Sequence, residues 1–176
     1  ALRKEEKKTA ATHLDECSIL FSEFSKIASK NPYSWFPSYR SATEIAEETS
    51  NNRMVGFPYT KYLNSVIRVN MASAFILMSQ SKADELNVAE NKRVYVHGCS
   101  ILNDIWNVTE RPDFHSSPAI KTCVNQSLDQ AEISLSDIKH FDLYSCFPSA
   151  VQIAKKELGI PEEKKDLTVT GGLPYF

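Results

Sequence analysis

The chain has 176 residues, of which 42% are hydrophobic and 24% are charged, and its formal net charge is −2. This length allows one domain with a substantial core. The near-neutral charge gives no electrostatic reason to bind nucleic acid or an anionic membrane, and no apolar run is long enough to span a bilayer.

Four cysteines lie far apart in the chain, at Cys17, Cys99, Cys123 and Cys146. No CxxC pair occurs, which favours reduced thiols over a disulfide framework. The first residues, ALRKEEKK, lack the apolar stretch of a signal peptide. We therefore expect a protein of the cytoplasm or of an organelle matrix, mitochondrial or peroxisomal, that is not secreted.

Residues 12–30 carry apolar side chains at helical spacing and predict a helix that Pro32 ends. Residues 31–60 are aromatic and proline-rich and show little periodicity, apart from a short helix that Ser41 can cap. A long irregular segment of this kind is usually functional or disordered, and its aromatic content indicates that it packs onto another part of the protein.

The rest of the chain alternates between expected strands and helices. Strands are expected at residues 71–79, 93–98, 140–144 and 167–172. Helices are expected at residues 81–88, which Ser81 caps, at 117–131, with Pro118 at the first position, and at 148–158, which Gly159 ends. This alternation predicts an α/β fold with a largely parallel, buried sheet.

Two of the expected strands end in residues that could carry chemistry, because ligands of open α/β sheets gather at the carboxyl ends of strands. One is followed by Tyr144–Pro148, and the other ends in Gly171-Gly172. Cys146 precedes a helix amino terminus, which could favour its thiolate, and paired glycines let a backbone approach a ligand closely. Alternatively, Cys146 is a small buried hydrophobic residue and Tyr144 a packed aromatic one.

Other sites have little support in the residues alone. His97 and Cys99 are separated by a single residue, which is not a metal-ligand spacing, so we expect no metal site. The acidic and basic residues between Asp104 and Asp113 are typical of a solvated loop or a local ion pair. No glycine-rich phosphate loop and no GxSxG motif is present.

Four phrases resemble the thiolase superfamily in their letters and in their order: NRMVGFPYTKYLNS (52–65), TERPDFHSSPA (109–119), DLYSCFPSAVQ (142–152) and LTVTGG (167–172). The chain is most similar to the thiolase-like branch labelled acetyl-CoA acetyltransferase, which is related to the sterol-carrier-protein thiolases. The resemblance implies a partial thiolase-like α/β fold. Residues 1–80 would hold the loop region and the last strand of the first half, and residues 81–176 the start of the second half.

The resemblance also implies an acyltransferase of lipid metabolism that binds an acyl-CoA thioester, with no tightly bound cofactor, as a homodimer or in a larger assembly. The nucleophilic cysteine of the family would lie upstream of Ala1, and its catalytic histidine and second cysteine downstream of Phe176. The chain also lacks an initial methionine. We therefore expect an internal portion of a longer polypeptide that is inactive by itself.

On the family pattern, Tyr144 falls at the position that helps to hold the oxyanion hole, where a tyrosine hydroxyl can donate a hydrogen bond. The residues expected near coenzyme A are Asn64, Val66, Cys146, Phe147, Gly171 and Gly172. Tyr144 departs from the family's asparagine or histidine, and Val66 stands where the family often has a serine.

Two other hypotheses follow from the same residues. The departures at Tyr144 and Val66 suit a catalytically inactive thiolase-like subunit with a structural or interaction role. A cysteine hydrolase that uses Cys146 has weaker support, because His140 lies on the same expected strand and no other partner is evident.

Overall fold

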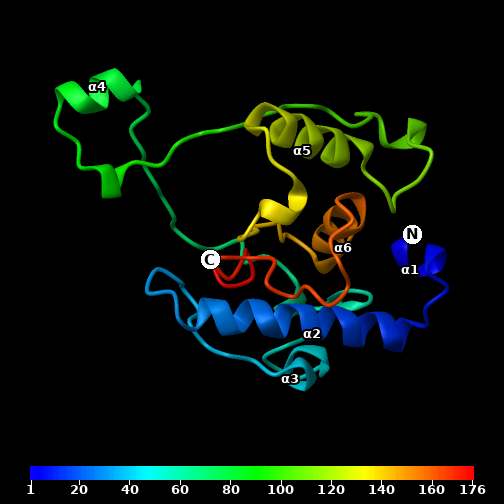
Figure 1. Ribbon diagram of the computed structural model, residues 1–176. Coiled ribbons are helices and arrows are strands. Elements are labelled where there is room, and N and C mark those ends of the chain that lie inside the picture. Colours follow the sequence, from blue (N-terminus) through cyan, green and yellow to red (C-terminus); the bar gives the residue numbers. More distant parts are fainter.

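The fold is described by a computed structural model that covers residues 1–176 and is mostly helical (Figure 1). Its elements, in chain order, are α1 (Leu2–Glu5), α2 (Ala10–Ala28), α3 (Ala42–Ala46), β1 (Met54–Gly56), β2 (Tyr59–Thr60), η1 (Lys61–Leu63), α4 (Gln80–Glu85), η2 (Glu90–Lys92), η3 (Val108–Glu110), α5 (Pro118–Ala131), η4 (Leu135–Asp137) and α6 (Pro148–Glu157). In Figure 1, α2 runs between α3 and α6, whereas α4 lies apart from the rest of the molecule.

Helix α2 is the longest element, and the structure confirms the helix expected there. Thr9 caps its amino terminus, because its hydroxyl accepts a hydrogen bond from the Thr12 N–H at 3.1 Å. One face of the helix is buried, with Cys17, Leu20, Phe21, Phe24 and Ala28 on it. Burial of this apolar stripe, more than helix propensity, stabilises the helix.

The hydrophobic core joins this amino-terminal helix to the carboxyl end of the chain. Eleven buried residues form one cluster: Cys17, Leu20, Phe21, Phe24, Ala28, Ile45, Leu63, Val151, Ile160, Leu167 and Tyr175. The Tyr175 hydroxyl donates to the Phe21 carbonyl at 3.3 Å, and burial raises the pKa of Tyr175 to about 12. Segments from both ends of the chain therefore share one core.

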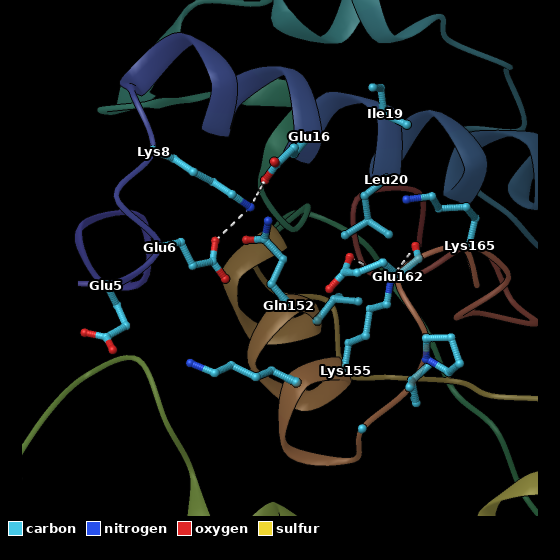
Figure 2. A pocket seen from close by; sticks show the side chains of 15 residues that line it. Glu5, Glu6, Lys8, Glu16, Ile19, Leu20, Gln152, Lys155, Glu162 and Lys165 are labelled. Atoms are coloured by element: carbon cyan, nitrogen blue, oxygen red, sulfur yellow. Dashed lines mark hydrogen bonds and ion pairs between the residues drawn. The ribbon is translucent and has the colours of Figure 1, made fainter.

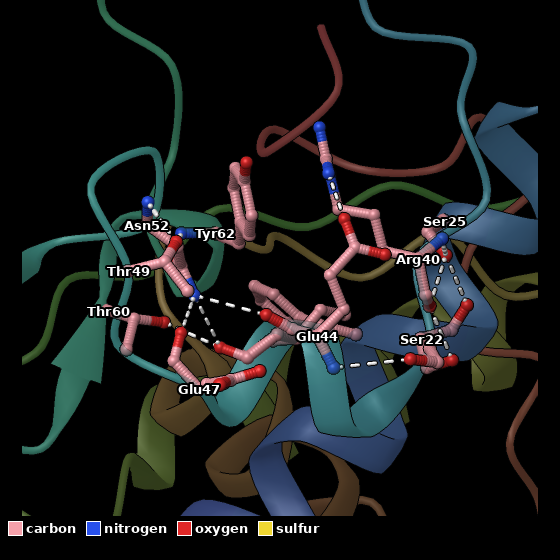
Figure 3. A network of polar contacts seen from close by, with 12 residues as sticks. Ser22, Ser25, Arg40, Glu44, Glu47, Thr49, Asn52, Thr60 and Tyr62 are labelled. Atoms are coloured by element: carbon pink, nitrogen blue, oxygen red, sulfur yellow. Dashed lines mark hydrogen bonds and ion pairs between the residues drawn. The ribbon is translucent and has the colours of Figure 1, made fainter.

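A single buried amide organises the region between α3 and η1 (Figure 3). The side chain of Asn52 donates to the carbonyls of Glu44, Ile45 and Glu47 at 3.2, 3.0 and 2.8 Å, and it accepts from the Tyr62 N–H at 2.9 Å. The donated bonds occupy carbonyls at the end of α3 that have no partner within the helix. Asn52 thereby joins α3 to the segment that follows the hairpin.

A small antiparallel hairpin lies inside the segment that we expected to be irregular. Strand β1 pairs with β2 in the register Met54↔Thr60 and Gly56↔Tyr59, with an irregularity between the two pairs. Strands of three and two residues are too short to show an alternating pattern, so the sequence analysis missed them.

None of the four expected strands forms as part of a sheet, and this corrects the prediction. Residues 71–79 and 93–98 make no ladder, and residues 140–144 contact the segment 167–172 through one backbone bond, from the Leu143 N–H to the Leu167 carbonyl at 3.0 Å. A strand exists only where a neighbour supplies hydrogen bonds, and apolar pattern alone does not supply one. The α/β class is therefore only loosely supported.

The remaining helices follow their local signals. Pro118 and Pro148 stand at the first position of α5 and α6, and Gly159, with φ of +66°, follows the end of α6. Helix α4 forms, but Ser79 caps it rather than Ser81, because the Ser79 hydroxyl accepts from the Lys82 N–H. The expected division of the chain near residue 80 stays a prediction.

Replacing Asn52 by alanine should destabilise the fold strongly, because four hydrogen-bonding groups around a buried side chain lose their partner. We expect a loss of about 3 kcal/mol in the free energy of unfolding, measured by urea denaturation. Asn51→Ala, at an exposed neighbouring position, is the matched control. A loss at Asn52 no larger than the loss at Asn51 would contradict the organising role.

Candidate functional site

Three segments that are distant in sequence meet at one place. The Ser65 N–H donates to the Cys146 carbonyl at 3.2 Å, and the Val66 N–H donates to the Leu173 carbonyl at 3.1 Å. The Ser145 hydroxyl accepts from the Leu173 N–H at 3.0 Å. We call residues 64–66, 144–148 and 171–175 the convergent segments. They contain every residue that the sequence analysis assigned to a site.

The turn at residues 144–148 lies at the centre of the convergent segments, and its buried residues fix the backbone there. Ser145 and Pro148 are buried and anchor the turn, whereas the side chain of Tyr144 is 70% exposed and Cys146 is half-buried. The neighbouring Cys146 thiol raises the pKa of Tyr144, so its hydroxyl stays protonated near neutral pH. Tyr144 is therefore a hydrogen-bond donor that solvent or a ligand can reach.

The paired glycines serve close packing. A side chain at Gly171 would meet the Ala28 backbone, with the Ala28 Cα 2.6 Å away, and one at Gly172 would lie 2.5 Å from the Ser145 hydroxyl. Their N–H groups donate to the hydroxyls of Thr168 and Thr170, at 3.0 and 3.2 Å. Both N–H groups therefore already have partners within the chain.

Phe147 connects the turn to a buried polar group on α2. The Phe147 ring stacks on Tyr59 with the ring centroids 6.0 Å apart, and the Tyr59 ring lies 6.3 Å from that of His13. His13 Nε2 is 3.7 Å from the Cys17 sulfur, while its Nδ1 atom is buried without a partner. Burial raises the pKa of Cys17 to about 12, which makes this thiol a poor nucleophile.

An aromatic segment borders the convergent segments, and the sequence analysis did not assign it to the site. The Ser34 hydroxyl and the Trp35 N–H donate to the Tyr175 carbonyl at 2.9 and 3.1 Å, and Trp35 Nε1 donates to the Asn70 carbonyl at 3.2 Å. Its exposed aromatic side chains are Tyr33, Trp35, Phe36 and Tyr39. The concentration of aromatic residues among prolines was the signal for this segment. Hydrogen bonds tie it to Tyr175 and Asn70, but its aromatic side chains are exposed and do not pack onto the protein as expected.

A cavity lies elsewhere, between α1, α2, α6 and residues 159–165 (Figure 2). Its volume is about 720 Å³, and lysines and glutamates dominate its lining. Lys8 bridges Glu6 and Glu16 at 2.9 and 2.7 Å, and Lys155 pairs with Glu162 at 3.3 Å. No residue of the convergent segments lines this cavity, and its charges largely pair with one another.

The remaining polar residues form local structure. Arg111 pairs with Asp104 at 3.0 Å, so of the two alternatives expected for this loop the structure shows the local ion pair. The structure brings no three His, Cys, Asp or Glu side chains together as a group that could hold a metal ion.

None of the helices combines the length and apolar character that crossing a membrane requires.

Comparison with solved structures supports a thiolase-like relationship. A crystal structure described as a monomeric SCP2-thiolase like protein type 1 from Mycobacterium smegmatis is 36% identical to this chain and matches it with a TM-score of 0.86. The match covers 99% of this chain and 38% of that protein, so the chain spans well under half of the length of this relative.

The same comparison bears on the other expectations. The fold is SCP2-thiolase-like over nearly the whole chain, and the family resemblance inferred from the four phrases is supported to that extent. The relative is described as monomeric, which does not fit the expectation of a homodimer. No model of a known protein family and no curated protein matched the chain.

Gly172→Ala should destabilise the fold by about 2–4 kcal/mol, because Gly172 has φ of +77° and an added Cβ would clash with Ser145 and Phe24. Urea denaturation measures this loss. Gly56→Ala is the control, since no atom lies within 4 Å of a Cβ added there. Equally small losses of unfolding free energy at both positions would contradict the close packing of Gly172 against Ser145 and Phe24.

His13 should make the stability depend on pH. Burial lowers its pKa, partly offset by Glu16 and Glu6 and reinforced by Lys8 and Arg3. As the pH falls below about 6.5, the unfolded chain takes up this proton before the folded one does, so stability is full above that pH and declines below it.

The test compares the free energy of unfolding at about pH 7.5 and about pH 5.5 in the wild type, His13→Gln and His140→Gln. His140 is exposed and serves as the control. We expect the loss on acidification to shrink in His13→Gln only. If His13→Gln lost as much stability on acidification as the wild type, protonation of His13 would not be linked to folding.

Proposed function

We propose that the convergent segments bind an acyl-CoA thioester and contribute to an acyl-transfer site of the acetyl-CoA acetyltransferase type. The observation that carries this proposal is the meeting of residues 64–66, 144–148 and 171–175 through backbone hydrogen bonds. These segments overlap three of the four phrases that resemble the thiolase superfamily. The similarity to an SCP2-thiolase-like protein over 99% of the chain supports the same assignment.

Each residue of the site has a distinct proposed role. The Tyr144 hydroxyl, exposed and protonated, would donate to the thioester oxygen as negative charge develops on it. Cys146 and Phe147 would border the thioester, beside Val66. Asn64 would act indirectly, because its side-chain amide already donates to the Thr60 carbonyl at 2.6 Å and so fixes the start of this segment.

Gly171 and Gly172 would set the position of the turn rather than contact coenzyme A through their N–H groups. Their role in the site is the close approach that they allow between α2, Ser145 and the end of the chain. A bulkier side chain at either position would displace the turn that carries Tyr144.

The chemical step needs a nucleophile from outside this chain. In acyl transfer a thiolate attacks the thioester carbonyl carbon, the bond from that carbon to the coenzyme A sulfur breaks, and coenzyme A leaves as a thiol after protonation. Cys17 is unsuited to this step, because burial raises its pKa to about 12. On the family resemblance, none of the other three cysteines falls at the position of the nucleophile either. We therefore propose that the chain supplies binding and oxyanion stabilisation, and that the reactive cysteine and the catalytic histidine come from polypeptide outside these 176 residues.

A catalytically inactive thiolase-like subunit is the second candidate. The observation that favours it is the 70% exposure of Tyr144, because a donor in a working oxyanion hole is normally held in a dry, preorganised site. In this case the convergent segments would bind acyl-CoA, or serve as a structural corner, without contributing to turnover.

Alkylation of the cysteines by N-ethylmaleimide, with and without acetyl-CoA, tests the binding proposal on the chain as it is. Acetyl-CoA has no free thiol and does not consume the reagent. We expect saturating acetyl-CoA to slow the alkylation of Cys146 by about fivefold or more, measured by peptide mass spectrometry, because the ligand covers a half-buried thiol. Cys99 is exposed and far from the convergent segments in sequence, and its rate should stay unchanged.

The outcomes separate the candidates. Protection of Cys146, with no thiolysis of acetoacetyl-CoA by the chain alone, supports the proposed site with an external nucleophile. Release of coenzyme A that Cys146→Ser abolishes would instead support the cysteine hydrolase. Equal alkylation of Cys146 with and without acetyl-CoA would overturn the binding proposal and leave the turn as a structural corner.

A further inference from the structure

The cavity between α1, α2, α6 and residues 159–165 has two walls of opposite net charge. The amino-terminal part of the chain supplies three glutamates and one lysine, which are Glu5, Glu6, Glu16 and Lys8. Helix α6 and residues 159–165 supply three lysines and one glutamate, which are Lys155, Lys156, Lys165 and Glu162. We call these two groups the acidic wall and the basic wall.

The ion pairs of the cavity form within each wall. On the acidic wall, Lys8 bridges Glu6 and Glu16. On the basic wall, Lys155 pairs with Glu162 and also donates to its carbonyl at 2.8 Å. No ion pair crosses the cavity from one wall to the other. The pairs therefore leave an excess of carboxylates on one side and an excess of ammonium groups on the other.

The acidic wall keeps its negative excess because its single lysine is already engaged. Burial lowers the pKa of Lys8, but the hydrogen bonds from this ammonium group to Glu16 and Glu6 outweigh burial and raise the pKa above its usual range. Lys8 is thus charged and held by two carboxylates. The remaining negative charge of this wall is available to a cationic group that enters the cavity.

The basic wall has hydrogen-bond donors that the chain does not use. An ammonium group carries three N–H donors, and Lys155 uses two of them on Glu162. Lys165 is exposed and forms no ion pair within the chain, although it lines the same cavity. Unused donors on positively charged groups favour an anionic group with several acceptor oxygens, such as a carboxylate or a phosphate.

Apolar side chains complete the cavity. Leu20, Val151 and Ile160 line it and belong to the buried core of the protein. Figure 2 shows Glu6 and Lys8 on one side of the cavity and Lys165 on the other, with Leu20 between them. A ligand that reaches from one wall to the other therefore passes over apolar surface, which favours an aliphatic linker.

These features restrict what the cavity can bind. A simple anion meets the carboxylates of the acidic wall, a simple cation meets the ammonium groups of the basic wall, and an uncharged apolar ligand desolvates both walls without pairing them. A molecule with one charge of each sign satisfies both walls. The volume of about 720 Å³ lies in the range of small-molecule sites.

We propose that this cavity binds a small zwitterion, with an ammonium group against the acidic wall, a carboxylate or phosphate against the basic wall, and an aliphatic linker over Leu20. The lining includes no residue of the convergent segments. The inference is therefore independent of acyl-CoA binding, and neither result decides the other.

Titration of the 176-residue chain with ε-aminocaproate, followed by amide NMR, tests the proposal. Caproate and hexylamine are the matched ligands, because each keeps the aliphatic chain and only one of the two charges. We expect ε-aminocaproate to bind at least about tenfold more tightly than either of them, and higher ionic strength to weaken it. The amide signals of Gln152 and Gly159 report on the cavity, and Lys121 on α5 serves as the remote reference.

Two further sets of ligands define the zwitterion. The series glycine, γ-aminobutyrate and ε-aminocaproate should bind with affinity that depends on length, because the walls fix the distance between the two charges. Phosphocholine carries a phosphate in place of the carboxylate. Tighter binding of phosphocholine than of every amino acid would identify a phospholipid headgroup as the source, and the reverse order would identify a free amino acid.

Variants on each wall make the test specific. Lys165→Gln should weaken ε-aminocaproate by about fivefold or more, whereas Lys164→Gln, at a neighbouring position outside the lining, should not. Glu16→Gln should weaken it likewise, and Glu23→Gln on the same helix is the control. Melting temperatures identify any variant that loses affinity because its fold is destabilised.

Three results would overturn the proposal. The first is binding of caproate or hexylamine as tight as that of ε-aminocaproate, because the two walls would then not act together. The second is the absence of any shift at Gln152 and Gly159 with every zwitterion at about 20 mM. The third is an equal effect of Lys165→Gln and Lys164→Gln, which would place the binding outside the cavity.

Discussion

The close approach of helix α2 to Gly171 and Gly172 is the constraint on which the rest of the structure depends. At these positions the end of the chain reaches the backbone of Ala28 and the ring of Phe24, with no room for a side chain. This contact lets Tyr175 enter the core and brings Ser145 within hydrogen-bonding distance of Leu173. The hydrophobic core, the turn at residues 144–148 and the convergent segments all follow from it.

Local signals explain which parts of the fold could be predicted from the sequence. The apolar spacing of residues 12–30, the proline at the start of α5 and α6, and Gly159 each act within one turn of a helix, and all three helices form. The expected strands depended on neighbours that a local pattern cannot specify, and no sheet forms from them. The hairpin at β1 and β2 was missed because each strand is only two or three residues long.

The candidate site shows the same division between local and non-local information. The family resemblance predicted Tyr144, Val66 and the paired glycines as site residues, but only the structure shows that the Val66 and Ser65 N–H groups donate to the two other segments. The stacking of Phe147 on Tyr59, and the contact of Tyr59 with His13, could not be seen in the sequence either. Aromatic stacking of this kind joins residues that are far apart in the chain and leaves no local pattern.

The hydrogen bond from Trp35 Nε1 to the Asn70 carbonyl joins the aromatic segment to the chain that follows the hairpin. The neighbouring Ser34 donates to the Tyr175 carbonyl at the edge of the convergent segments. One indole ring therefore connects the chain at residue 70 to the segment that borders the candidate site. Because the chain has only two tryptophans, Trp35 and Trp106, its intrinsic fluorescence reports in part on this junction.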